Sequence, residues 1–154
     1  MTGDVKNLLD TPEPPELGPG PRQGVLPEKT LNEELKKLGA SELLRAAVLV
    51  WHDHLDLAHK IVQNIEDRDG SYIHAIIHRR EPDYSNSKYW FHRVGNHPCF
   101  AELSRQVKEP EFAKGWDPFV FVDLCQRHDP KREQRLREIQ ALELQTVVEY
   151  LANM

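Results

Sequence analysis

Apolar side chains recur at helical spacing through the middle of the chain. Between residues 42 and 65 they return every three or four positions, which on a helix places them along one broad face. Ser41 stands just before this run and suits a helix N-cap. The pattern therefore predicts one long central helix over residues 42–65, with Trp51 and Ile61 in the core. The predicted face consists of Leu44, Ala47, Val48, Trp51, Leu55, Ala58, Ile61, Val62 and Ile65.

A polar stripe borders this apolar face on the same predicted helix. Its members stand four, three and four residues apart, so their side chains stack along one edge of the helix. They are His52, Asp56, His59 and Gln63. A polar stripe beside a buried face is typical of a helix that lines a pocket, and we therefore expect His52 and His59 to share a pocket wall.

A second polar stripe follows on the next predicted helix. His74, His78 and Glu81 stand at positions i, i+4 and i+7, among isoleucines that supply an apolar face. The link EDRDGS before them is short, and short links join antiparallel neighbouring helices. We therefore expect the two stripes to face each other, with Pro82 ending the second helix.

A third, shorter helix is predicted after the turn PDYSNS, ending at Gly95. Asn86, Tyr89 and Arg93 recur on it at helical spacing, and Trp90 lies beside them. This helix is expected to close the pocket from a third side, with the two aromatic residues as apolar wall or hydrogen-bond donors.

The two parts of the chain differ in character. Residues 1–27 hold six of the eleven prolines, and proline removes backbone donors and fixes φ, so an extended or flexible arm without regular structure is expected there. Residues 28–154 carry helix-start signals such as Asp117-Pro118, although the β-branched residues of 119–124 leave a strand as the alternative. The prediction is an all-α fold with a single compact domain of five to seven helices over 28–154.

The charge distribution limits the kinds of partner. A formal net charge of −5 argues against nucleic acid, which requires a basic face. Residues 78–93 are locally basic, however, and favour a small anionic or strongly polar ligand held by Arg79, Arg80 or Arg93. Successive helical residues point about 100° apart, so at most one of Arg79 and Arg80 is expected to reach such a ligand. Arg93 is the favoured contact, and the alternative is a salt bridge to a carboxylate of the neighbouring stripes.

The location of the protein is suggested only by what its sequence lacks. There is no apolar run of the signal-peptide or membrane-spanning type, so no membrane partner is expected. Cys99 and Cys125 lie far apart and resemble neither a disulfide framework nor a zinc ribbon. A reducing compartment, the cytoplasm, is the expected location.

A family resemblance covers nearly the whole domain after the arm. The runs WHDHLDLAHKIVQ and IHAIIHRREPDYSNSKYWFHRVGNHPCF resemble an uncharacterised family of small bacterial and fungal proteins. The shared pattern reads roughly WHD, AH, IHA-x-x-HRRE-x-D, N-x-x-YW and R-x-x-G. That pattern often has glycine where this chain has Pro82, and tends to have arginine where it has His92. The resemblance implies no activity, and it leaves His92 without an expected role.

Three functions fit these patterns. The first is a small helical enzyme or ligand-binding protein in which His59 and His78 move protons as general acid and base. The second is a divalent-metal site built from histidines on facing helices, without an HExxH motif. The third is an interaction module whose histidines and arginines form a buried polar network without chemistry.

The expected pocket draws on all three predicted helices. For ligand binding, the expected residues are His52, Asp56, Gln63, His74, Glu81, Asn86, Tyr89, Trp90 and Arg93. For metal binding, the available ligands are His52, His59, His74 and His78. No cofactor other than a divalent metal is suggested.

Overall fold

The computed structural model describes residues 3–154, which form helices and connecting segments and contain no strand. The all-α prediction is thereby confirmed. The described residues contain nine α-helices and one short 3-10 helix. Eight of the α-helices lie within residues 28–154, where five to seven were predicted, and the other forms at residues 3–7 of the arm that was expected to lack regular structure. In chain order these are α1 Gly3–Asn7, α2 Glu28–Lys37, α3 Glu42–Trp51, α4 Leu55–Val62, α5 Arg68–Arg80, α6 Tyr84–Val94, α7 Pro98–Gln106, η1 Pro110–Phe112, α8 Pro118–Arg127 and α9 Glu133–Ala152.

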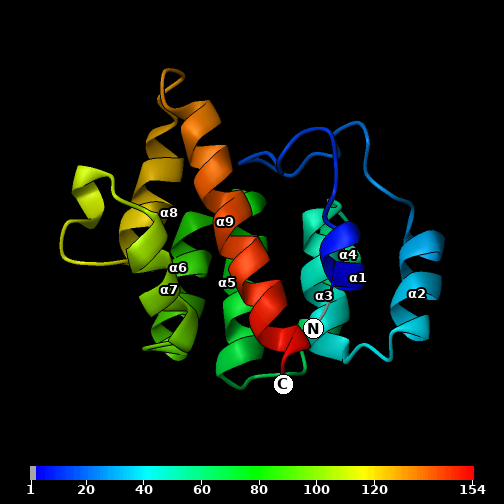
Figure 1. Cartoon of the computed structure of the whole chain (residues 1–154). Helices are drawn as coiled ribbons and strands as arrows, with labels where there is room; N and C mark the ends of the chain where they lie inside the picture. Colours follow the sequence, from blue (N-terminus) through cyan, green and yellow to red (C-terminus); the bar gives the residue numbers. More distant parts are fainter. Residues whose placement is uncertain (1–2) are drawn as a thin grey trace.

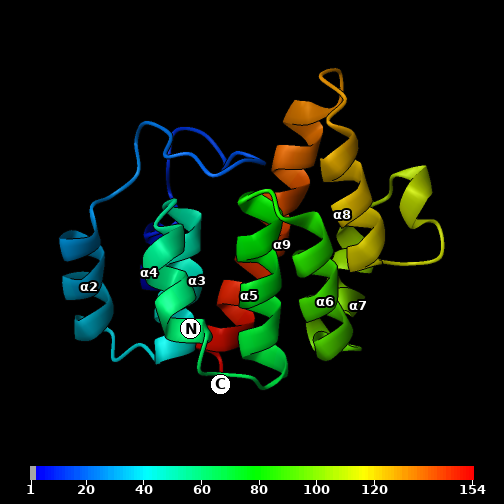
Figure 2. The same ribbon diagram turned by 180° about the vertical axis from the view of Figure 1, so that it is seen from behind.

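Helix α5 lies at the centre of the molecule, between α4 on one side and α6 on the other (Figures 1 and 2). Helix α9 packs across α3 and α7, α8 packs on α6, and α2 lies at the outer edge against α3. Every residue of α5 from Gly70 to Arg80 is buried, including two histidines and two arginines. The most buried helix is therefore also the one that buries the most ionisable side chains.

The long helix predicted over residues 42–65 is wrong, because the chain breaks between α3 and α4. Asp53 takes a left-handed conformation with φ of 66°, which ends the regular helix and turns the chain. Its carboxylate binds Arg22 at 2.7 Å and Arg80 at 2.8 Å, and these charge-assisted contacts stabilise the break. Trp51 is in the core as predicted, at 3% exposure, whereas Ile61 is only half-buried.

Two helix starts, those of α3 and α8, behave as the sequence indicates. The Ser41 side chain accepts a hydrogen bond from the Leu44 backbone N–H and caps α3. The Asp117 side chain accepts from Phe119 N–H and caps α8, with Pro118 in its first turn. Residues 119–124 are therefore helical, and the strand alternative does not hold.

The N-terminal segment consists of α1 followed by an irregular segment, residues 8–26, which we call the strap. It crosses the end of the molecule from α1 to α9 and returns toward α2 (Figure 1). Residues 1–2 of the expected arm lie outside the described residues. Side chains of the helical domain donate hydrogen bonds to its carbonyls, including Arg80 to Gly18 at 2.8 Å, Arg137 to Pro14 at 2.6 Å and Gln140 to Glu16 at 2.8 Å.

These bonds satisfy backbone carbonyls of the strap, because its prolines lack the N–H groups that could donate to them from within the segment. Leu8, Leu9 and Leu17 also bury their side chains in the common core. Gly20, with φ of 70°, passes so close to Asp53 that a Cβ there would lie 2.8 Å from Oδ2. Glycine is required at this crossing both for the conformation and for the space.

Candidate histidine site

Helices α4 and α5 bring three imidazole rings together. One nitrogen from each of His59, His74 and His78 lies within 4.8 Å of the others. The ring centroids are 4.7 Å apart for His59 and His74, and 4.8 Å apart for His74 and His78. The latter two stand one turn apart on α5, and His59 reaches them from the neighbouring α4. We call these three residues the histidine cluster.

Two nitrogens of the cluster are buried without a hydrogen bond. They are Nδ1 of His74 and Nδ1 of His78. The latter is 2.9 Å from Glu81 Oε1, but the carboxylate lies off the direction that a ring N–H bond requires. The other nitrogen of His78, Nε2, is 3.4 Å from Asn86 Nδ2, which is a long contact. The cluster is thus poorly satisfied by the protein's own groups, which is unusual for buried polar atoms.

Aromatic side chains form one wall of the cluster. Trp90 of α6 stacks on His74 with centroids 3.9 Å apart and ring planes 13° apart. Arg93 lies over the Trp90 ring at 5.3 Å and is itself exposed. Tyr89 contacts Trp90 edge-on at 5.2 Å but is 52% exposed, so it stands at the rim. The stacking fixes the plane of the His74 ring.

The electrostatics around His74 favour its neutral imidazole. Burial, together with the nearby His78 and His59, lowers the pKa of His74 to about 4. His74 is 4% exposed and its near neighbours within the cluster are other imidazoles, so no carboxylate compensates a positive charge on it. At pH 7 its ring is a neutral lone-pair donor. This is the form that binds metal ions.

His52 does not share a wall with His59, contrary to prediction. It follows the last residue of α3, where its Nε2 is 2.6 Å from Leu8 O and its Nδ1 accepts a hydrogen bond from Leu26 N–H. The break at Asp53 removes it from the helix that carries His59. Asp56 and Gln63 are exposed on or just after α4, and their side chains form no hydrogen bond or ion pair within residues 3–154. Only His59 of the first stripe therefore reaches the cluster.

Both arginines of the HRRE run are held in buried networks. Arg79 is 2.7 Å from Glu143 and also donates to Gln140, both on α9. Arg80 binds Asp53 and donates to the carbonyl of Val50 at 3.1 Å. Both arginines are 0% exposed, so neither has surface to offer a ligand. At most one of Arg79 and Arg80 was expected to reach a ligand, and neither does. Of the three arginines considered as ligand contacts, only Arg93 is exposed.

The partners of these arginines were missed by the sequence analysis. Glu143 and Gln140 are both fully buried, and Glu143 also accepts from Tyr72 Oη at 3.1 Å. Burial and the Glu143 carboxylate raise the pKa of Tyr72 well above its usual value, so its hydroxyl stays a donor. The helical spacing of α9 could have indicated that Gln140 and Glu143 are buried, because these two polar residues share its apolar face with Leu136, Leu144 and Val147.

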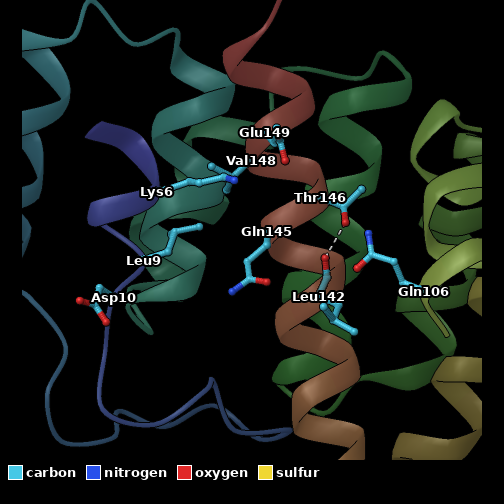
Figure 3. A pocket seen from close by; sticks show the side chains of 9 residues that line it. All are labelled: Lys6, Leu9, Asp10, Gln106, Leu142, Gln145, Thr146, Val148 and Glu149. Atoms are coloured by element: carbon cyan, nitrogen blue, oxygen red, sulfur yellow. Dashed lines mark hydrogen bonds between the residues drawn. The ribbon is translucent and has the colours of Figure 1, made fainter. Parts of the chain in front are cut away.

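Two surface pockets lie on different sides of the molecule. A pocket of about 400 Å³ lies between α1, α7 and α9, and both polar and apolar side chains line it (Figure 3). Figure 3 shows Lys6, Leu9 and Asp10 on one side of it and Gln145 of α9 pointing toward them, whereas Thr146 lies on the other side of α9 beside Gln106. Another pocket of about 380 Å³ has Asp56 and Glu81 in its lining, so it adjoins the histidine cluster through Glu81.

Comparisons with protein-family models, with curated proteins and with solved structures found no match to this chain. None of the helices within residues 3–154 combines the length and the apolarity that crossing a membrane requires. The function therefore has to be argued from the site itself.

Proposed function

We propose that this protein binds a transition-metal ion, with Zn²⁺ as the best fit, through His59, His74 and His78. Zinc binds neutral imidazole nitrogens in tetrahedral geometry. Three protein ligands leave a fourth position for water or a substrate, which is the arrangement of catalytic zinc sites rather than closed structural ones. A bound ion would act as a Lewis acid and would lower the pKa of a water in that position.

The observation that carries the proposal is the convergence of three rings that have few other partners. Buried histidines in a purely structural role find hydrogen bonds, as His52 and His97 do in this protein. In the cluster, Nδ1 of His74 and Nδ1 of His78 find none. A metal ion would bind one lone pair of each ring, and His78 would offer Nε2, because its Nδ1 faces Glu81.

The spacing is compatible with an ion after a small adjustment. With Zn–N bonds near 2.05 Å, tetrahedral geometry places ligand nitrogens roughly 3.4 Å apart. The nitrogens of the cluster lie within 4.8 Å of one another, so they must close by up to about 1.4 Å. His59 is half-buried on α4, and rotation of its side chain can supply this movement, whereas His74 is held by Trp90.

Glu81 is placed to support the site. Its Oε1 is 2.9 Å from His78 Nδ1, and a carboxylate beside the second nitrogen of a histidine ligand orients the ring and raises its basicity. A small reorientation would turn this contact into a hydrogen bond. The pocket that Glu81 shares with Asp56 would then give a small molecule a route to the ion.

Metal binding can be tested by titrating metal-depleted protein with Zn²⁺ in a calorimeter and against a chromophoric chelator. We expect one equivalent to bind to the wild type, with affinity reduced at least 100-fold in His59→Ala. His92→Ala is the matched control, because His92 is an exposed histidine outside the cluster. Absence of binding to the wild type, or equal losses in the two variants, would refute the proposal.

A second candidate function rests on Arg93. This side chain is exposed, stacks on Trp90 and forms no ion pair within the described residues, so its guanidinium is available to a small anion. Millimolar phosphate or acetate should then raise the melting temperature of the wild type. Arg93→Gln should lose this effect, and Arg127→Gln, which changes another exposed arginine without an ion pair, should keep it. If no anion stabilises the wild type, this candidate is excluded.

A further inference from the structure

His52 holds the strap at both of its ends. Its ring is 1% exposed, with Nε2 at 2.6 Å from the Leu8 carbonyl and Nδ1 at 3.0 Å from the Leu26 amide nitrogen. A carbonyl can only accept and an amide N–H can only donate. The ring must therefore be neutral, with its proton on Nε2. Protonation of Nδ1 would set two N–H groups against each other and break the bond to Leu26.

His54 binds the same strap residue in the opposite sense. Its Nε2 is 2.8 Å from the Leu26 carbonyl, so it donates a proton to this bond. Gaining a second proton leaves His54 a donor, and the bond survives. Leu26 is thus held by two histidines, of which only His52 has to be neutral.

Of the charges around His52, those of Arg22 and His54 oppose its protonation and that of Asp53 favours it. The charged and titratable groups that face it are Arg22 from the strap, and Asp53 and His54 from the link between α3 and α4. Arg80 of α5 binds the same Asp53 carboxylate as Arg22 does. One carboxylate already serves two guanidinium groups, so a third positive charge would have no buried counter-ion.

We propose that the strap is an acid-released latch, loosened at Leu26 when His52 takes up a proton and loses its bond to the Leu26 N–H, so that only the His54 bond to the Leu26 carbonyl still holds this end. Opening would widen two surface pockets that the strap helps to line. Glu16, Leu17 and Gly18 line one of them, and Pro19 lines the other beside Asp56. The second of these pockets adjoins the histidine cluster through Glu81. The latch stands on its own contacts and does not depend on metal binding.

The direction of the pH response follows from the same geometry. Burial lowers the pKa of His52 below its ordinary value, because the charged form loses solvation. The closed strap is therefore fully favoured above about pH 6.5, the ordinary pKa of histidine. Its advantage over the open strap is lost progressively as the pH falls below that value toward the lowered pKa.

Hydrogen exchange of the full-length chain at pH 7.5 and pH 5.0 tests the latch. Protection factors, which correct for the intrinsic pH dependence of exchange, should fall at least tenfold at the Arg22 and Leu26 amides, while those of α5 stay high. In His54→Gln the fall should persist. In His52→Gln, whose side chain is neutral at both pH values, it should disappear. Persistence of the fall in His52→Gln, or its loss in His54→Gln, would overturn the proposal.

A second measurement covers the case in which glutamine fails to hold the strap even at pH 7.5. An NMR titration of the wild type follows the His52 ring proton and the Leu26 amide together. The latch requires the two to change at the same midpoint. If His52 titrates without a change at Leu26, or if α5 loses protection along with the strap, the latch is refuted.

Discussion

Arg79 and Arg80 are adjacent in the chain but serve different parts of the fold. Arg79 joins α5 to α9 through Glu143, whereas Arg80 joins α5 to the break after α3 through Asp53. Their separation of about 100° around the helix sends the two side chains in different directions. An arginine that the sequence pattern suggests as a ligand contact can therefore be the counter-ion of a buried carboxylate. The pattern does not reveal this, because the carboxylates, Glu143 and Asp53, lie far from Arg79 and Arg80 in the chain.

Breaking the Arg79–Glu143 pair should be severe. Arg79→Met leaves a carboxylate at 0% exposure without its cation, and we expect a loss of about 3–5 kcal/mol in unfolding free energy by chemical denaturation. Arg45→Met is the control, because Arg45 pairs with the exposed Glu42 and should cost about 1 kcal/mol or less. Similar losses in the two variants would show that the buried network contributes little.

Trp51 and His59 should differ in the same assay. Trp51 is 3% exposed and packed in the core, so Trp51→Ala should cost on the order of 3–5 kcal/mol. His59 is half-buried and its ring makes no hydrogen bond within residues 3–154, so His59→Ala should cost far less in metal-free protein. Equal destabilisation would mean that His59 is a core residue and not a ligand.

At the scale of elements, the break between α3 and α4 is the feature that most changes the site. The apolar periodicity across residues 42–65 is continuous, so nothing in the spacing marks the break. Its cause lies elsewhere in the sequence, in Arg22 and Arg80, whose side chains converge on Asp53. Local pattern predicts that both segments are helical and that Ser41 caps the first, but not the counter-ions that separate them into two helices.

Asp53→Asn tests this explanation. Asparagine tolerates positive φ, so the turn can persist, but Arg22 and Arg80 lose their shared carboxylate. We expect a loss of roughly 3–5 kcal/mol in unfolding free energy. Asp56→Asn is the control, because Asp56 is exposed in the first turn of α4 and its side chain has no partner within residues 3–154. Its unfolding free energy should stay within about 0.5 kcal/mol of wild type. Wild-type stability in Asp53→Asn would remove the ion pairs as the cause of the break.

For the whole molecule, the sequence predicts the helices better than their arrangement around the strap. Facing stripes at helical spacing place His59 near His74 and His78, and the structure brings these three together. His52 obeys the same spacing but belongs to the strap, because its partners, Leu8 and Leu26, are contributed by an irregular segment. A proline-rich segment with few internal backbone hydrogen bonds carries no periodicity from which its contacts could be predicted.

Stability should fall as the solution is acidified from neutral pH. Burial lowers the pKa of His52 and of His97, so both stay neutral in the folded protein at pH values where the unfolded chain is protonated. Below about pH 6.5 the unfolded state binds more protons, and the unfolding free energy decreases with falling pH. Denaturation midpoints at pH 7.5, 6.5 and 5.5 should decline in that order. A constant or rising midpoint would contradict the buried neutral state of these histidines.

The central claim is that His59, His74 and His78 hold one metal ion. Crystals grown with one equivalent of Zn²⁺, with diffraction recorded on both sides of the zinc absorption edge, test it most directly. The account predicts one anomalous peak with a nitrogen of each of the three histidines at 2.0–2.1 Å. A peak only at exposed histidines such as His92 or His128, or no peak beside the cluster, would contradict it.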